Sequence, residues 1–209
     1  LPFTKAFSVS SGTLRRSSKA LGNKMETFAP PRRFVDHPHY EADRKRALKT
    51  LVIDEIDAPI RDIVAGFSRL PYCFTLQSCF GHFVHSESAA PDNLEPLPPR
   101  DVGVVTYRIA YVALCLENST SGNHLFSALA EVPSISPAFI RFGSPVWFWE
   151  RQVNAFALQV EPKRFKDRDQ ATLDYTEALQ VQRVRNQFFT RLDDLVNALN
   201  YRRFGFGPH

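Results

Sequence analysis

The residues most able to do chemistry lie close together between positions 73 and 85. They are two cysteines and two histidines: Cys73, Cys79, His82 and His85. Thiolates and imidazoles are ligands that zinc favours, but gaps of five, two and two residues do not match a standard zinc pattern. Cys73 also lies in an apolar run, where a buried structural cysteine is expected. We therefore predict no bound metal here, and a zinc-stabilised site is the alternative.

The same residues permit two further kinds of chemistry. Cys79 could act as a nucleophile with His82 as its base, which requires that the two side chains come within hydrogen-bond reach. A small cysteine in a turn, with no such role, is the simpler interpretation. His82 could also accept a proton by itself, because an unshifted imidazole has its pKa near neutrality.

A strand and the turn after it must position these side chains. Residues 72–77 (YCFTLQ) predict the strand, and residues 78–82 predict the turn. Before them, Asp57 and Pro59 are typical of a helix start, with Asp57 as the capping acid. Gly81 permits a tight turn or a close approach by a ligand. Because strand-end loops expose side chains and N–H groups, we expect a binding loop here.

The segment FTLQSCFGH at 74–82, preceded by the helix over 59–64, resembles the tRNA wybutosine-synthesising protein 3 family. Members of that family carry Thr-Thr-Ser-Ser-Cys-Ser-Gly-Arg at this place, and Ser78, Cys79 and Gly81 match it. The run FALQV at 156–160 resembles the C-terminal strand of the family. The resemblance implies an α+β fold and S-adenosylmethionine-dependent methylation of a tricyclic guanosine base in tRNA.

The sequence departs from the family signature at four positions. The family has Thr, Ser, Ser and Arg where this chain has Leu76, Gln77, Phe80 and His82. The anionic contact of the family's arginine is therefore not carried over directly. The motif spans nine residues, so the resemblance bears more on the fold than on the reaction.

Residues 153–161 predict a second strand that could line a pocket. Alternate residues of a strand share a face. The face suited to a core carries Phe156, Leu158 and Val160. The other face carries Ala155, Ala157, Gln159 and Glu161. Small residues there would leave room for a guest and polar ones could orient it, whereas a half-exposed sheet face is the alternative.

The resemblance, taken with these residues, implies an S-adenosylmethionine-dependent, methyltransferase-like protein acting on a modified tRNA base. Its cofactor-binding residues would be Ser78, Cys79, Gly81 and Gln159, and its catalytic residues His82 and Glu161. The alternative function is a non-enzymatic module that binds a small ligand or is stabilised by zinc.

The charge of the chain is unevenly distributed. The 209 residues carry a formal net charge of +4. Residues 1–24 contribute five basic side chains and no acid, so residues 25–209 have 21 basic against 22 acidic residues. Any contact with tRNA is therefore expected to be local. The basic run after the second strand would make it, through Lys163, Arg164, Lys166 and Arg168.

The chain is expected to form one domain over residues 34–209, preceded over 1–33 by a disordered leader or a tail added for expression. Helices and strands are intermixed, which predicts an α+β fold with a mainly antiparallel or mixed sheet covered by helices. Residues 104–117 predict its longest strand. The apolar spacing over 173–199 predicts a long amphipathic helix with polar residues such as Arg185 facing away from the core.

Several classes of protein are disfavoured. The chain has no P-loop, GxGxxG, HExxH or GxSxG motif. No apolar run approaches the ~18 residues of a membrane span, so no membrane partner is expected. Three cysteines make a disulfide framework improbable, which favours a cytoplasmic location. Trp147 and Trp149 could stack a base or adenine, although aromatic clusters more often belong to a core.

Overall fold

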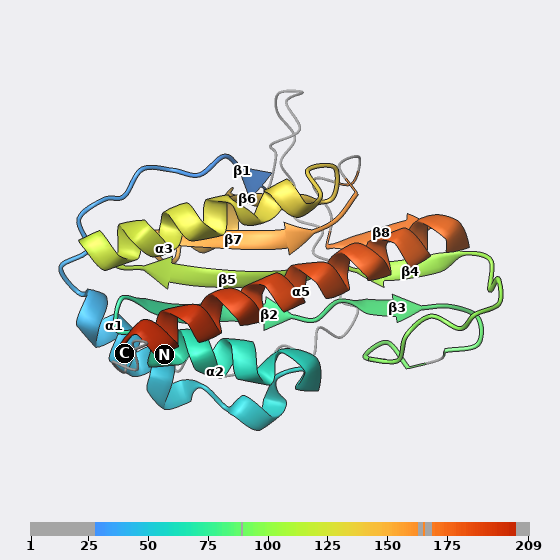
Figure 1. Ribbon diagram of the computed structural model, residues 1–209, viewed down its shortest axis with the longest axis horizontal. Helices are drawn as coiled ribbons and strands as arrows, with labels where there is room; N and C mark the ends of the chain where they lie inside the picture. The colour runs from blue at the N-terminus through green and yellow to red at the C-terminus, as the bar shows by residue number, and fades with distance from the viewer. Residues whose placement is uncertain (1–27, 89, 163–164, 166–168, 204–209) are drawn as a thin grey trace, which may run out of the picture.

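The fold is α+β, as predicted, with antiparallel sheets and a long C-terminal helix (Figure 1). This computed structural model describes residues 28–88, 90–162, 165 and 169–203. The α-helices are α1 (Tyr40–Thr50), α2 (Arg61–Arg69), α3 (Thr120–Ala130), α4 (Val146–Trp149) and α5 (Tyr175–Arg203). Short 3-10 helices are η1 (Ile53–Glu55), η2 (Ala58–Ile60) and η3 (Val132–Ile135). The strands are β1 (Phe28–Ala29), β2 (Cys73–Cys79), β3 (His82–Val84), β4 (Val105–Arg108), β5 (Ala110–Leu116), β6 (Ile140–Pro145), β7 (Ala155–Val160) and β8 (Gln170–Leu173).

Two antiparallel sheets lie end to end. The larger has the order β1-β6-β7-β5-β2 and the smaller has the order β3-β4-β8. Strand β2 continues into β3 after residues 80–81, and β4 continues into β5 after Ile109. Since β2 pairs with β5 and β3 pairs with β4, both sheets are interrupted at the same level (Figure 1). We call this level, at residues 80–81 and 109, the sheet junction.

Glycine is required on one side of the sheet junction. Gly81 has φ +86°, a left-handed conformation that L side chains rarely adopt. A Cβ atom there would lie 2.9 Å from the Ala110 Cβ. The Tyr107 hydroxyl accepts a hydrogen bond from the Ala110 N–H at 2.9 Å and donates to the Val160 carbonyl at 3.0 Å. The junction is therefore a packed and hydrogen-bonded feature.

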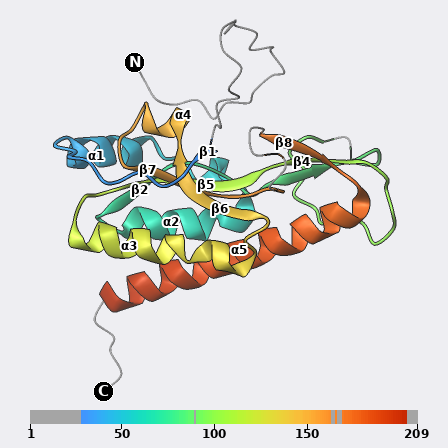
Figure 2. The same ribbon diagram turned by 90° about the horizontal axis from the view of Figure 1, so that it is seen from above.

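Helices cover both faces of the larger sheet. Figure 2 shows α2, α3 and α5 on one side of it and α1 and α4 on the other. The face toward α2 and α5 carries the main core, in which Phe156 and Leu158 are buried with Val112. Ala157 belongs to a separate small cluster on the opposite face. The two-faced pattern predicted over 153–161 is thus confirmed within β7.

The sequence pattern missed or misplaced several boundaries. The strand predicted over 104–117 is two strands in two sheets, because its pairing partner changes from β8 at Arg108 to β7 at Ala110. The turn predicted over 78–82 is shorter, since Cys79 ends β2 and His82 begins β3. The sheet also includes residues before the expected boundary at 33, because Phe28 pairs with Pro145.

Within the described part of the chain, no helix combines the length and the apolar character that crossing a membrane requires. The long helix predicted over 173–199 is present as α5. Residues 1–27 and the basic residues Lys163, Arg164, Lys166 and Arg168 lie outside the described residues.

Candidate functional site

The structure brings the predicted binding loop and the polar face of β7 to the same surface of the larger sheet. Cys79 is paired with Tyr111 of β5, and Tyr111 is paired with Gln159 of β7. Gln159 is in turn paired with Arg141 of β6. Directly paired residues of an antiparallel sheet share a face. Four strands therefore contribute one polar row, which we call the Cys79–Arg141 row.

Ser78 does not join this row. It is paired with Val112, which belongs to the main core on the side of α2 and α5. Because successive residues of a strand point to opposite faces, Ser78 faces away from Cys79 and Gln159. The structure thus separates the Ser78 side chain from those of Cys79 and Gln159.

Glu161 lies at the end of the row and is completely buried. Its carboxylate oxygen Oε1 is 2.7 Å from Arg141 Nη2. Gln159 beside them is 8% exposed. A buried carboxylate needs such an ionic partner. In this conformation Glu161 anchors Arg141 and is shielded from a ligand, so its expected catalytic role has no direct geometric basis.

The small-residue part of the same face is covered. Ala113 and Ala157 are buried, with Leu76 and Phe148 packed against them. The Phe148 ring also lies 6.4 Å from the ring of Tyr111. The space that the small residue Ala157 was expected to leave for a guest is therefore filled by side chains of β2 and α4.

At the sheet junction, Asp57 joins two of the predicted site residues. Its Oδ2 accepts a hydrogen bond from the Phe80 N–H at 2.7 Å and lies 3.4 Å from His82 Nε2. One ligand atom from each of Asp57, Cys79 and His82 lies within 4.8 Å of the other two, so this set could hold a metal ion. We call these three residues the junction cluster.

Asp57 was expected to cap the helix that follows it. It stands at the N-cap of η2, but its side chain makes no capping hydrogen bond there. The carboxylate instead accepts a hydrogen bond from the Phe80 N–H, in the turn between β2 and β3. A local capping signal cannot reveal such a contact, because the turn lies in a different part of the sequence.

The junction cluster is strongly polarised. The hydrogen bond with Asp57, together with that to Cys79, raises the pKa of His82 to about 10 even though burial opposes this. Burial would raise the pKa of the Asp57 carboxyl, but hydrogen bonds from His82 and Phe80 hold it below its ordinary value. The metal-free pair is therefore ionic at neutral pH. The proton-accepting role expected of His82 does not fit a protonated ring.

The other two members of the predicted cysteine and histidine set lie elsewhere. Cys73 is buried in the main core, where its thiol donates to the Phe67 carbonyl at 3.2 Å and burial raises its pKa. His85 forms an isolated bridge with Ser88 beyond the end of β3. This placement agrees with the expectation that Cys73 is a buried structural cysteine.

Arg185 of α5 contacts the sheet junction. It is 3% exposed, and its Nη1 donates to the Gly81 carbonyl at 2.8 Å. Its guanidinium lies 4.0 Å from the centre of the Phe80 ring and 5.0 Å from that of Phe83. The expectation that Arg185 faces away from the core is wrong. The turn offers it a carbonyl and two aromatic faces, which compensate for burial of the charge.

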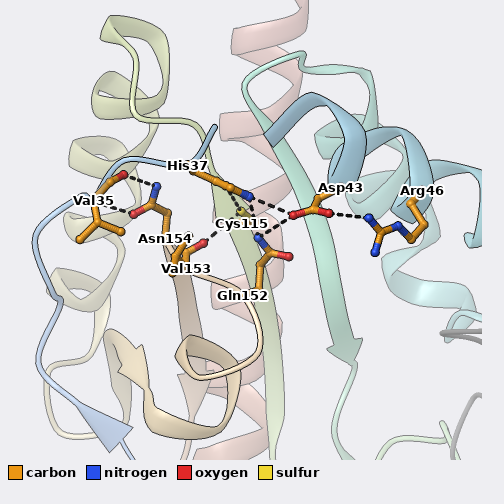
Figure 3. Close-up of polar contacts among 8 residues, drawn as sticks. All are labelled: Val35, His37, Asp43, Arg46, Cys115, Gln152, Val153 and Asn154. Carbon is orange, nitrogen blue, oxygen red and sulfur yellow. Dashed lines mark hydrogen bonds and ion pairs between the residues drawn. The ribbon is translucent and has the colours of Figure 1, made fainter. Parts of the chain in front are cut away.

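A second polar cluster lies at the other end of the larger sheet (Figure 3). His37 Nε2 is 3.0 Å from Asp43 Oδ2, and the Gln152 amide nitrogen is 3.1 Å from the same ring nitrogen. His37 Nδ1 lies 4.0 Å from the Sγ of Cys115. We call His37, Asp43, Cys115 and Gln152 the His37 network. It joins the segment before α1 to the loop before β7.

The two tryptophans considered for stacking have different surroundings. Trp149 packs edge-on against Phe156, with ring centres 5.8 Å apart, so it contributes to the core. Trp147 is 60% exposed, and the Arg151 guanidinium lies 3.1 Å from its ring centre. Of the two, Trp147 alone presents much of its ring to solvent.

Comparison with known proteins assigns no family to the chain. No protein-family model matches it, and no curated protein matches it. Among solved structures it is similar to that of the PH1069 protein from Pyrococcus horikoshii, with a TM-score of 0.49 and 11% identity. The match covers 76% of this chain and 96% of that chain. We draw nothing about function from a similarity of this size.

Proposed function

We propose that this protein is an S-adenosylmethionine-dependent methyltransferase that acts on a modified base of tRNA. One observation carries the proposal. The resemblance to the tRNA wybutosine-synthesising protein 3 family rests on two separate segments, at 74–82 and 156–160. Cys79 from the first and Gln159 from the second are both paired with Tyr111. Segments distant in sequence thus meet on one face.

Methyl transfer from a sulfonium suits such a surface. A nucleophilic atom of the base attacks the methyl carbon, the carbon–sulfur bond breaks, and S-adenosylhomocysteine leaves with the bonding electron pair. The reaction depends mainly on in-line positioning and exclusion of water. In this proposal Gln159 orients a polar edge of the ligand, while the ion pair of Glu161 with Arg141 keeps the row in place. Gly81 sets the path of the loop.

The remaining parts of the proposal rest on the sequence. A small ligand and tRNA are the proposed partners, with tRNA contacted through the basic residues 163–168. The proposed location is the cytoplasm. The tRNA contact follows from the distribution of charge, and the location follows from the small number of cysteines.

Calorimetry with S-adenosylmethionine and S-adenosylhomocysteine tests the cofactor site. The wild-type chain is expected to bind both, and Gln159→Leu is expected to weaken binding at least about tenfold by removing a buried hydrogen-bonding group. Gln187→Leu on the exposed side of α5 is the matched control and should bind as the wild type does. Absence of binding by the wild type, or equal affinity in Gln159→Leu, would contradict the proposal.

A non-enzymatic binding module is the second candidate. This alternative includes a module stabilised by zinc, and the junction cluster favours it, because Asp57, Cys79 and His82 could hold a metal ion. Incubation with labelled S-adenosylmethionine and tRNA distinguishes the two. Cofactor binding with no label transferred to tRNA would support the module and contradict the enzyme.

A further inference from the structure

We propose that Asp57, Cys79 and His82 bind a divalent transition-metal ion, and that zinc fits them best. The three residues come from the segment before η2, the end of β2 and the start of β3. Their ligand atoms, a carboxylate oxygen, a sulfur and an imidazole nitrogen, all lie within 4.8 Å of one another. The proposal concerns the junction cluster itself and does not depend on S-adenosylmethionine.

The separation of two of the three donors, those of Asp57 and His82, matches that of ligands around one ion. Zinc binds nitrogen and oxygen at about 2.0–2.2 Å, so two such ligands in a tetrahedron lie about 3.3–3.6 Å apart. Asp57 Oδ2 and His82 Nε2 are 3.4 Å apart. A hydrogen bond between a charged nitrogen and a carboxylate is shorter, at about 2.7–2.9 Å. This pair is thus spaced more like two ligands of one ion than like a tight ion pair.

The surroundings of the cluster orient its donors. His82 Nδ1 lies 3.4 Å from the Asn93 carbonyl, which suits an Nδ1–H donor and leaves Nε2 for a metal. Histidine ligands commonly make such an outer contact. The Gly81 N–H donates to the Cys79 sulfur at 3.4 Å, a contact that stabilises a thiolate. The hydrogen bond from Arg185 to the Gly81 carbonyl connects the turn that carries these donors to α5.

The donor types select the metal. A thiolate, a carboxylate and a neutral imidazole together carry a charge of −2, which complements a divalent cation. Magnesium and calcium prefer oxygen ligands, whereas sulfur and imidazole favour zinc and its neighbours in the transition series. The side chain of Asp57 is 24% exposed and Cys79 is half-buried. Three protein ligands, of which Asp57 and Cys79 reach solvent, leave a fourth position for water, as in open zinc sites.

Cobalt(II) is the probe for this site, because a cobalt–thiolate bond gives a charge-transfer band and tetrahedral cobalt gives intense visible bands. The full chain is treated with a chelator, transferred to metal-free buffer and titrated with cobalt, and zinc is then added. We expect both sets of bands to appear at one equivalent and to disappear when zinc displaces cobalt.

Variants assign the ligands. Cys79→Ser should abolish the charge-transfer band, while Cys115→Ser, which alters the other polar cluster, should keep it. Asp57→Asn and His82→Asn should each weaken cobalt binding by at least the roughly 10- to 100-fold that an outer-shell change costs. Circular dichroism shows whether each variant is folded, and Asp57→Asn keeps the test available if Cys79→Ser does not fold.

The outcome is separable from that of the proposed function. Gln159→Leu should lose affinity for S-adenosylmethionine and keep the cobalt bands. A wild-type chain that develops no bands with excess cobalt would overturn the metal site, as would a charge-transfer band that survives Cys79→Ser. Neither result would change the calorimetric test of cofactor binding.

Discussion

The junction cluster and the His37 network contain the same three residue types and differ in what those residues can do. Each places a cysteine and an aspartate near one histidine. In the junction cluster the cysteine is half-buried and its sulfur accepts the Gly81 N–H. In the His37 network Cys115 is completely buried, and its thiol donates to the Val153 carbonyl at 3.4 Å. The first arrangement suits a thiolate that a ligand can reach, whereas the second suits a neutral core thiol.

Burial and backbone contacts therefore decide the chemistry more than residue type does. Burial raises the pKa of the Cys115 thiol well above its ordinary range. The network instead ties the chain together. Near it, the Asn154 side chain accepts from the Val35 N–H at 2.9 Å and donates to the Val35 carbonyl at 3.0 Å (Figure 3). We interpret the His37 network as a structural cluster that connects separate segments of the chain, and the junction cluster as the candidate site for ligand chemistry.

Thiol reactivity gives the largest expected contrast between the two clusters. In chelated protein, Cys79 should react with a disulfide reagent without unfolding. Cys115 and Cys73 should react only through opening of the fold, which at a stability of about 5 kcal/mol slows them about 10³-fold or more. Mass spectrometry of the modified peptides measures the rates. Zinc should protect Cys79 alone, and equal rates for Cys79 and Cys115 would remove the distinction.

A substitution at Gly81 tests whether the junction is as rigid as the contrast requires. Gly81→Ala adds a Cβ at positive φ, 2.9 Å from the Ala110 Cβ, so strain and overpacking together should lower the free energy of unfolding by about 2–4 kcal/mol. Gly103→Ala is the matched control: its φ is also positive, at +76°, but no atom lies within 4 Å of the added Cβ. Its cost should be about 1 kcal/mol. Urea unfolding that gives equal costs for both would contradict the close contact.

The pH dependence of stability sharpens the description of the metal-free junction. The pKa of His82 is about 10 in the folded chain against an ordinary value of 6.5, so its stabilisation is complete below pH 6.5 and is lost as pH rises through 10. The lowered pKa of Asp57 stabilises the fold above its ordinary value of 3.8, and this is lost as pH falls through the folded value. Stability from the pair is therefore greatest between about pH 4 and 6.5.

His82→Asn should flatten the decline in stability between pH 6.5 and 10. After allowance for solvent screening at the partly exposed Asp57, the change should be about 1 kcal/mol. His124→Asn, at an exposed position of α3, is the control. Chemical unfolding of chelated protein across this pH range makes the measurement, and an unchanged slope in His82→Asn would show that the pair is not ionic.

The smallest effect is expected at the outer edge of the His37 network. Arg46 Nη2 lies 2.8 Å from Asp43 Oδ1, but the Arg46 side chain is 60% exposed. Such a pair is screened by solvent, so Arg46→Ala should cost at most about 0.5 kcal/mol. Thermal unfolding at low and high salt measures it. A larger loss would mean that Arg46 positions Asp43 for His37 and that the network extends to the surface.

Local patterns in the sequence determined much of this fold. The spacing of apolar residues over 173–199 predicted α5, and the alternation over 153–161 predicted which residues of β7 face the main core. Both patterns arise because one side of a single helix or strand faces the core. The spacing of apolar residues within a short stretch of sequence is enough to show which side that is. The motif at 74–82 likewise drew attention to Cys79 and His82, which lie in the junction cluster.

Contacts between distant segments were decided only by the tertiary structure. Asp57 carries the signal of a helix cap, yet its carboxylate binds the turn at Phe80. Arg185 occupies a polar position of an amphipathic helix, yet it is buried because it contacts the Gly81 carbonyl and the Phe80 ring. A charged side chain enters the interior only where other elements supply its partners. Those partners come from the packing of the whole chain, so no local pattern can reveal them.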